Sequence, residues 1–205
     1  MKMRIDNNSS NKQKSPIKKS GKRSSALKIT LCGLFTALIA AGAFIKIPIP
    51  NLPFTLQDMF VLLGGLLLGP ALGGMSAFIY MIIGLAGIPV FTQGGGIGYV
   101  LRPSFGYIIG FVIGAFVSGI VSRRVREGSY FGQFLAALSG LAVIYAVGIP
   151  YFWAVSTFYL GKTIALWPLL GMCLFTTLPG DIALCFLTAY ISKALRPAIK
   201  RYLPR

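Results

Sequence analysis

The sequence predicts an all-α integral membrane protein with six transmembrane helices, and both its composition and the placement of its charges indicate this fold class. Of its 205 residues, 55% are hydrophobic and 12% are charged, and the mean hydropathy is +0.75. A soluble domain carries about 25% charged residues, because its surface must face water. A chain with so little charge has too little polar surface for water, so we expect lipid to surround most of it.

The start of the chain differs from the rest and predicts a disordered, basic cytoplasmic tail over residues 1–26. This segment is rich in Lys, Ser and Asn and has too few apolar residues to bury a core. A signal peptide is the alternative, because Ala41-Gly42-Ala43 resembles a cleavage site. The membrane domain is predicted over residues 27–196, and a second basic cytoplasmic tail over 197–205.

Proline and glycine divide the membrane domain into spans, since a helix needs about 20 apolar residues to cross a bilayer. Pro48 and Pro50 end the first span, and Gly69-Pro70 breaks the long uncharged stretch that follows Asp58. Residues 154–180 contain several Gly and Pro residues and are predicted as loops with a partial helix. The predicted spans cover residues 27–47, 58–69, 71–88, 104–122, 131–153 and 181–195.

The basic residues gather in three clusters that six spans place on one side. Nine of the 20 Lys and Arg lie in residues 1–28, three in 123–126 and five in 193–205. With an even number of spans, 17 of the 20 face the cytoplasm, as the positive-inside rule requires. The net charge of +16 therefore indicates membrane topology and no nucleic-acid partner. The loops 48–57, 89–103 and 154–180 fall on the outer side.

Three features of the predicted spans and loops are candidates for function. The glycine run Gly94–Gly98 is expected to form a loop that covers a ligand, because glycine permits close approach of backbone. Asp181 and Asp58 each begin a span, either as helix caps or as functional carboxylates at membrane depth. The third feature is a face of small residues on the first span, which suits close approach of a partner helix; it consists of Gly33, Ala37 and Ala41.

Other kinds of chemistry find little support in the sequence. There is no histidine, which removes histidine metal sites and Ser-His triads, and the three cysteines stand singly in apolar runs. Gly161-Lys162-Thr163 looks like the end of a P-loop, but Ser156 occupies the position of the first glycine. No ATPase, metal or cofactor is predicted for the chain itself.

Four motifs taken together resemble the BioY family, the biotin-specific S components of energy-coupling-factor transporters. They are Pro53-Phe54-Thr55-Leu56-Gln57, the loop Gly94–Tyr99, the segment from Arg102 to Tyr107 with Gly110-Phe111, and Leu178-Pro179-Gly180-Asp181. The resemblance covers about residues 27–196. It implies the six-helix S-component fold and uptake of biotin at high affinity into a bacterial cell. It also implies assembly with a transmembrane coupling subunit and two cytosolic ATPases, with the small residues of the first span contacting the coupling subunit.

One departure from the family concerns charge. Many members carry a lysine three residues after the aspartate of the PGD motif, where this chain has Leu184. Biotin offers two ureido N–H donors, an apolar thioether ring and a carboxylate tail. We expect Asp181 to accept the ureido N–H bonds and Arg102 to bind the tail, or else to neutralise an aspartate. The predicted substrate site consists of Asp181, Arg102, Tyr99, Gly98, Tyr107, Gln57 and Trp153.

Alternatives of different classes remain open at this stage. The first is an S component for another vitamin such as riboflavin or thiamine, with the same fold and a different pocket. An intramembrane aspartyl protease with an Asp58–Asp181 dyad is the enzyme alternative, although Leu178 breaks the usual GxGD pattern. A solitary channel or carrier is the third, but spans three to five hold no charge to line a polar path.

Overall fold

The computed structural model describes residues 19–47, 54–126, 128–161 and 165–200. Its elements, in chain order, are helix α1 (Lys19–Phe44), strands β1 (Lys46–Ile47) and β2 (Phe54–Thr55), helices α2 (Gln57–Leu68) and α3 (Pro70–Leu85), the 3₁₀ turn η1 (Ile97–Leu101), α4 (Phe105–Arg124), α5 (Tyr130–Ala154), the π-helical turn η2 (Val155–Tyr159), α6 (Leu166–Thr176) and α7 (Leu178–Lys200). The two short strands pair antiparallel beside the helices.

The six predicted spans correspond to α1, α2, α3, α4, α5 and α7, so the predicted fold class is confirmed. Four helical stretches are long and apolar enough to cross a membrane: Ser25–Phe44, Phe105–Arg124, Tyr130–Tyr159 and Leu178–Ile199. Helices α2 and α3 are shorter, with 12 and 16 residues. At 1.5 Å per residue α2 rises about 18 Å, less than the hydrocarbon thickness of about 30 Å.

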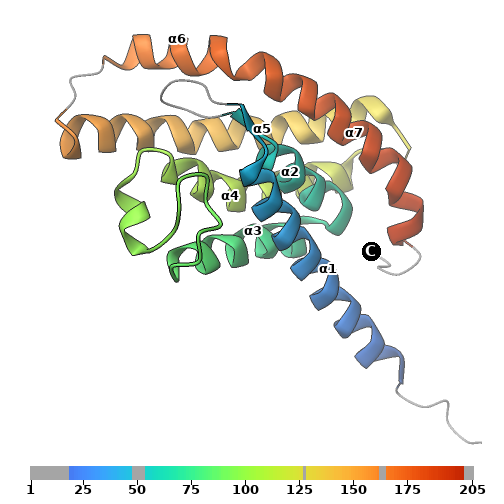
Figure 1. Ribbon diagram of the computed structural model, residues 1–205. Helices are drawn as coiled ribbons and strands as arrows, with labels where there is room; N and C mark the ends of the chain where they lie inside the picture. Colours follow the sequence, from blue (N-terminus) through green and yellow to red (C-terminus); the bar gives the residue numbers. More distant parts are fainter. Residues whose placement is uncertain (1–18, 48–53, 127, 162–164, 201–205) are drawn as a thin grey trace, which may run out of the picture.

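Helix α2 lies at the centre of the bundle, where it packs against α1, α3, α4, α5 and α7 (Figure 1). Nearly all its residues are buried, which explains why its sequence is apolar on every side. It ends at Gly69, whose φ of 85° favours glycine, and Pro70 begins α3. The predicted break at Gly69-Pro70 is thus where the chain turns.

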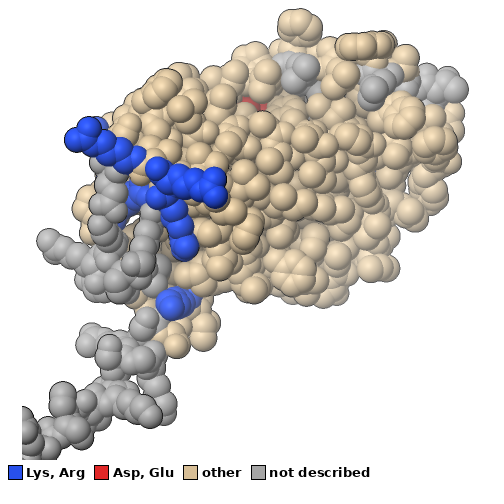
Figure 2. Space-filling view, turned by 180° about the vertical axis from the view of Figure 1, so that it is seen from behind, with Lys and Arg blue, Asp and Glu red and all other residues tan. Residues whose placement is uncertain are grey.

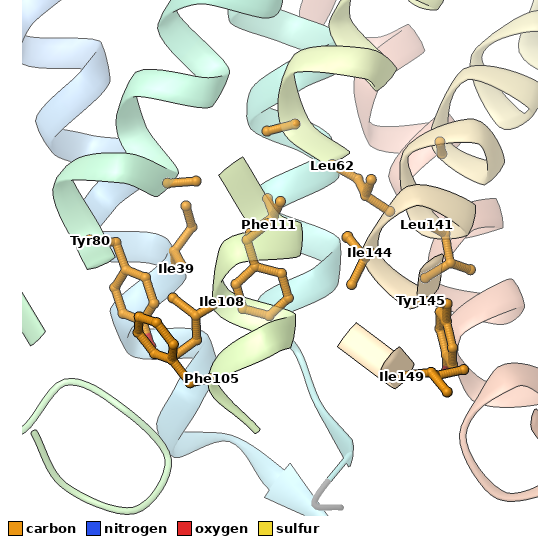
Figure 3. Packing of buried hydrophobic residues seen from close by; sticks show 14 of the residues in the cluster. Ile39, Leu62, Tyr80, Phe105, Ile108, Phe111, Leu141, Ile144, Tyr145 and Ile149 are labelled. Atoms are coloured by element: carbon orange, nitrogen blue, oxygen red, sulfur yellow. The ribbon is translucent and has the colours of Figure 1, made fainter. Parts of the chain in front are cut away.

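Small residues allow the helices to approach closely. A Cβ atom added to Gly114 of α4 would lie 2.8 Å from the carbonyl oxygen of Gly140 on α5. One added to Gly65 of α2 would lie 2.3 Å from the carbonyl oxygen of Ala115. Membrane helices gain little from the hydrophobic effect against each other, so such close contact is a main source of their packing energy. Apolar side chains fill the core between the helices, among them Ile39, Leu62, Phe111 and Ile144 (Figure 3).

Both ends of the predicted membrane domain differ from expectation. Helix α1 begins at Lys19, so residues 19–26, predicted as disordered tail, are helical. Lys and Arg are good helix formers, so their charge does not prevent the helix from extending beyond its apolar part. At the other end α7 continues to Lys200, past the predicted end of the domain at residue 196. The remaining tail residues, 1–18 and 201–205, lie outside the described part.

The segment 154–180 contains more helix than predicted. Helix α5 contains Pro150 and runs on through the π-helical turn η2 to Tyr159, and α6 follows after the loop at Gly161. Helix α7 begins at Leu178, so Asp181 lies in its first turn, with its backbone N–H donating to the carbonyl of Thr177 at 3.0 Å. Lys162 and Thr163, in the sequence that resembles a P-loop, lie outside the described residues.

On the face shown in Figure 2, basic residues gather at one end of the molecule, whereas Lys46 and Arg102 lie beside Thr92 and Tyr99. Arg123 and Arg124 occupy the last turn of α4, and Lys193 lies near the end of α7. On the face shown, acidic atoms appear as a small area away from this end. Large apolar side chains are exposed elsewhere on the surface, including Ile29, Ile113 and Phe116, as expected of a surface that faces lipid.

Candidate functional site

A cavity opens among the helices at the end where α2 and α7 begin. Together with the open solvent at its mouth it encloses about 590 Å³. Its walls come from β2, α2, α3, the loop between α3 and α4, α4, α5 and α7. The lining residues are Thr55, Gln57, Asp58, Tyr80, Thr92, Tyr99, Ser104, Tyr107, Ile108, Phe111, Tyr145, Thr177 and Asp181.

The loop between α3 and α4 folds back onto the end of α3, and glycine makes this possible. The N–H of Gly96 donates to the carbonyl of Gly84 at 2.7 Å, and Gly96 has a φ of 101°. A Cβ atom on Gly84 would lie 2.0 Å from the ring of Phe91, which is buried beneath the loop. The predicted loop therefore packs firmly against α3 and contributes Tyr99 to the cavity. Its role in covering a ligand stays a prediction.

Aromatic and hydroxyl side chains hold this wall in place. The ring of Phe91 packs edge-on against Tyr80 and lies 4.5 Å, centroid to centroid, from the ring of Tyr99. The hydroxyl of Tyr99 lies 3.1 Å from that of Thr92 and accepts a bond from Ser104 at 3.3 Å. These contacts fix the orientation of the Tyr99 ring.

A second polar chain runs from α2 to the same loop. The side-chain amide of Gln57 donates to the hydroxyl of Tyr80 at 2.7 Å, and that hydroxyl donates to the carbonyl of Val90 at 3.1 Å. The sequence placed Gln57 in the site, and the structure shows it buried and lining the cavity. Tyr80 was not singled out, because it lies within an apolar span and no short motif marks it.

Asp181 is the most buried charged group of the cavity, with 4% of its surface exposed. Its Oδ2 accepts a hydrogen bond from the hydroxyl of Tyr145, which also lies 2.6 Å from the hydroxyl of Thr177. Its Oδ1 is buried and has no hydrogen-bond partner among the described residues. An unpaired buried acceptor is costly, so this oxygen is available to a ligand that brings a donor.

Asp58 lies in the first turn of α2 and lines the same cavity as Asp181. The two acidic side chains share this lining with Tyr145 and Thr177. No Lys or Arg stands among the cavity-lining residues in the described part of the chain. The cavity therefore combines two acids with aromatic and hydroxyl groups and lacks a cation of its own.

Arg102, expected to bind an anionic tail, is exposed and does not line the cavity. Its guanidinium donates to the side-chain oxygen of Gln93 and lies 5.5 Å from the centroid of the Tyr99 ring. Lys46, which sequence reasoning set aside, donates to the carbonyl of Thr92 at 3.2 Å. Two cations thus stand next to lining residues, at the edge of the site.

Of the three remaining predicted site residues, one lines the cavity and two do not. Tyr107 lines the cavity, and its ring meets that of Tyr145 edge-on at 6.0 Å between centroids. Gly98 neighbours Tyr99 but is not part of the lining. Trp153 packs edge-on against Phe158, also outside the lining. The lining residues that sequence reasoning missed include Tyr80, Thr92, Ser104, Tyr145 and Thr177.

The small-residue face of α1 lies outside the bundle. Gly33, Ala37 and Ala41 are all exposed, and a Cβ atom on Gly33 would meet no heavy atom within 4 Å. The opposite side of α1 buries Phe35 and Ile39 in the core. This face is therefore not used for packing within the described chain.

A helical membrane bundle with a polar cavity between its helices defines a membrane protein that holds a small ligand. Comparison with known proteins gives the family: the model of the BioY family matches residues 12–201, and the chain belongs to that family. The resemblance noted from the four motifs is thereby confirmed. Because the named members are transporters, the chain is a transporter protein and not an enzyme, although Asp58 and Asp181 do share a cavity.

Individual relatives agree with this. A probable biotin transporter from Lysinibacillus sphaericus is 52% identical over 130 residues, which cover 63% of this chain and 66% of that protein. A biotin transporter from Rhodobacter capsulatus is 33% identical, over 82% of this chain and 92% of its own length. Among solved structures, the S-component for biotin from an ECF-type ABC transporter superimposes with a TM-score of 0.74 at 29% identity, covering 84% of this chain and 92% of that one.

Proposed function

We propose that the protein binds biotin at high affinity and takes it up as the substrate-specific subunit of an ECF-type ABC transporter. The observation that carries this is the buried Oδ1 of Asp181, an acceptor without a partner among the described residues, in a cavity lined by aromatic and hydroxyl side chains. A ureido N–H is a donor that satisfies it. Family membership and the likeness to the biotin S-component support the same ligand.

The cavity's other walls suit the rest of the biotin molecule. Ile108 and Phe111 of α4 offer apolar surface for the thioether ring, beside the ring of Tyr107. The valerate carboxylate extends to the edge of the site, where Arg102 binds it through its planar fork of N–H donors. Arg102 takes this part because Leu184 stands where many family members have lysine.

Transport requires partners, and the exposed face of Gly33, Ala37 and Ala41 is the docking surface for the transmembrane coupling subunit. Its lack of bulk lets a partner helix approach α1 closely. Two cytosolic ATPases complete the assembly and supply the energy, since no ATPase motif is recognised in this chain. The basic end of the bundle faces the cytoplasm of a bacterial cell membrane, with both termini on that side and the cavity opening outward.

Equilibrium dialysis of the purified full chain against labelled biotin, riboflavin and thiamine tests the ligand. We expect saturable retention of biotin that unlabelled biotin displaces and the other vitamins do not. Retention of riboflavin or thiamine in place of biotin would assign the protein to another vitamin.

A further inference from the structure

Two carboxylates face one cavity, and the proposed function uses only one of them. Asp181 comes from the first turn of α7 and Asp58 from the first turn of α2, and these two helices pack against each other. Both residues line the cavity. Tyr145, which donates to the Oδ2 of Asp181, lines it as well.

Two acidic side chains in one cavity of a membrane protein are unfavourable when no cation lies beside them. No Lys or Arg lines the cavity in the described part of the chain. The partial positive charge at the starts of α2 and α7 favours a negative charge at both positions. The Oδ1 of Asp181 is buried and without a described partner, so at least one acceptor of the two acids is unsatisfied.

We infer that Asp58 and Asp181 bind the ligand as a pair, each accepting one of two N–H groups on the same planar head. This rests on the proposed function, because the ureido ring of biotin presents two such N–H groups on opposite sides of one carbonyl. Asp58 is then a specificity-determining residue. The pair selects a cyclic urea that carries hydrogen on both nitrogens. The pair contacts neither the sulfur atom nor the acidic tail.

The division of labour follows from the contacts. Asp181 is fixed, because Tyr145 holds its Oδ2 and Thr177 in turn contacts the Tyr145 hydroxyl. Asp58 is partly exposed and lies in the first turn of α2. A ligand with two N–H groups donates one hydrogen bond to each carboxylate and so places an N–H dipole beside each of them. A ligand with one donor leaves one carboxylate unpaired in the cavity, which disfavours its binding.

A crossover experiment with two modified ligands tests this inference. The ligands are the two biotin derivatives that carry a single methyl group on one or the other ureido nitrogen. The proteins are the full wild-type chain, Asp58→Asn and Asp181→Asn, with Asp58→Ala and Asp181→Ala to make room for a methyl group. Affinity for each ligand is measured by equilibrium dialysis, and insertion and thermal stability of every variant are checked first.

We expect Asp58→Asn to weaken biotin by about tenfold to a hundredfold, as loss of a bond to a charged acceptor predicts. Asp58→Ala should restore binding of one methylated derivative only, and Asp181→Ala should restore the other only. Dethiobiotin, which keeps both N–H groups, should depend on Asp58 as biotin does.

Three results would contradict the inference that Asp58 and Asp181 bind the ligand as a pair. Unchanged biotin affinity in a folded Asp58→Asn protein would leave Asp58 without a part in binding. An equal response of both derivatives to both variants would make Asp58 structural. If the wild-type chain and Asp58→Asn bound dethiobiotin equally well, the sulfur atom of biotin would take part in recognition by Asp58. Failure of the proposed function itself looks different, because the wild-type chain would then retain no biotin at all.

Discussion

Replacing Asp181 with asparagine perturbs the binding of biotin at the most buried acceptor of the cavity. The side chain keeps its size but loses its charge, and an amide nitrogen takes the place of one oxygen. If that nitrogen points to Tyr145, the hydroxyl donor there meets another donor; if it points to the cavity, the ureido N–H does. Either orientation removes one hydrogen bond to a charged acceptor.

Such a bond contributes about 1.5–3 kcal/mol, which corresponds to a loss of biotin affinity of roughly tenfold to a hundredfold. The assay is equilibrium dialysis of the detergent-purified full chain with labelled biotin. Asp181 also lies in the first turn of α7, where a carboxylate stabilises the helix, so a thermal unfolding comparison must accompany it. Gln57→Glu is no suitable control because it adds charge to the cavity; Arg126→Gln, at the basic end, changes one charge outside it.

Two results would refute this reasoning. Unchanged biotin affinity in a folded Asp181→Asn protein would show that its carboxylate binds no ligand. An equal loss of affinity in Arg126→Gln would show that the assay responds to any change of charge.

Four further predictions follow from the same structure. Arg102→Ala should weaken biotin strongly but biotin amide little, and equal losses for both ligands would assign Arg102 to structure alone. Tyr145→Phe should weaken biotin by a few-fold, because Asp181 loses the donor that orients it; an unchanged affinity would contradict this. Ala37→Trp should abolish ATP-driven uptake and leave biotin binding intact, whereas Ile113→Trp, on another exposed face, should leave both intact; assembly of Ala37→Trp with the coupling subunit would remove α1 as the docking surface. Gly98→Cys, placed where a side chain has room, should react with a membrane-impermeant reagent added outside intact cells, and labelling only from the cytoplasm would reverse the topology.

The sequence predicted the helices well because their ends carry local signals. Gly69-Pro70 stops one helix and begins the next whatever surrounds it, and Arg123 and Arg124 mark the last turn of α4. The start of α1 was misplaced because polarity was taken to mean disorder, yet Lys and Arg extend a helix readily. Local sequence rules do not decide whether a helix extends from its apolar part into a neighbouring polar segment.

The candidate site was predicted only in part. Asp181 stood out because an ionisable residue within an apolar region is rare, and Gln57, Tyr99 and Tyr107 belong to motifs that the family shares. Tyr145 carries no such signal, because it reads as one more aromatic residue within an apolar span. Its position beside Asp181 depends on how α5 packs against α7, which one sequence does not reveal.

Arg102 was predicted within the site, and the structure places it just outside the cavity lining. It was placed in the site because it follows the glycine run and because cations away from the basic clusters are few. In the structure its neighbours are Gln93 and the face of Tyr99, so it stands at the edge of the cavity. Closeness along the chain placed it near the ligand site, but which side of the loop it faces depends on how that loop folds onto α3.

The most direct measurement of the central claim is an experimental structure of the full chain with biotin bound. The account predicts the ureido ring within hydrogen-bond distance of the Asp181 carboxylate, the thioether ring against Ile108 and Phe111, and the valerate tail toward Arg102. Biotin bound in the reverse direction, with its acid beside Asp181, or bound outside this cavity would contradict it.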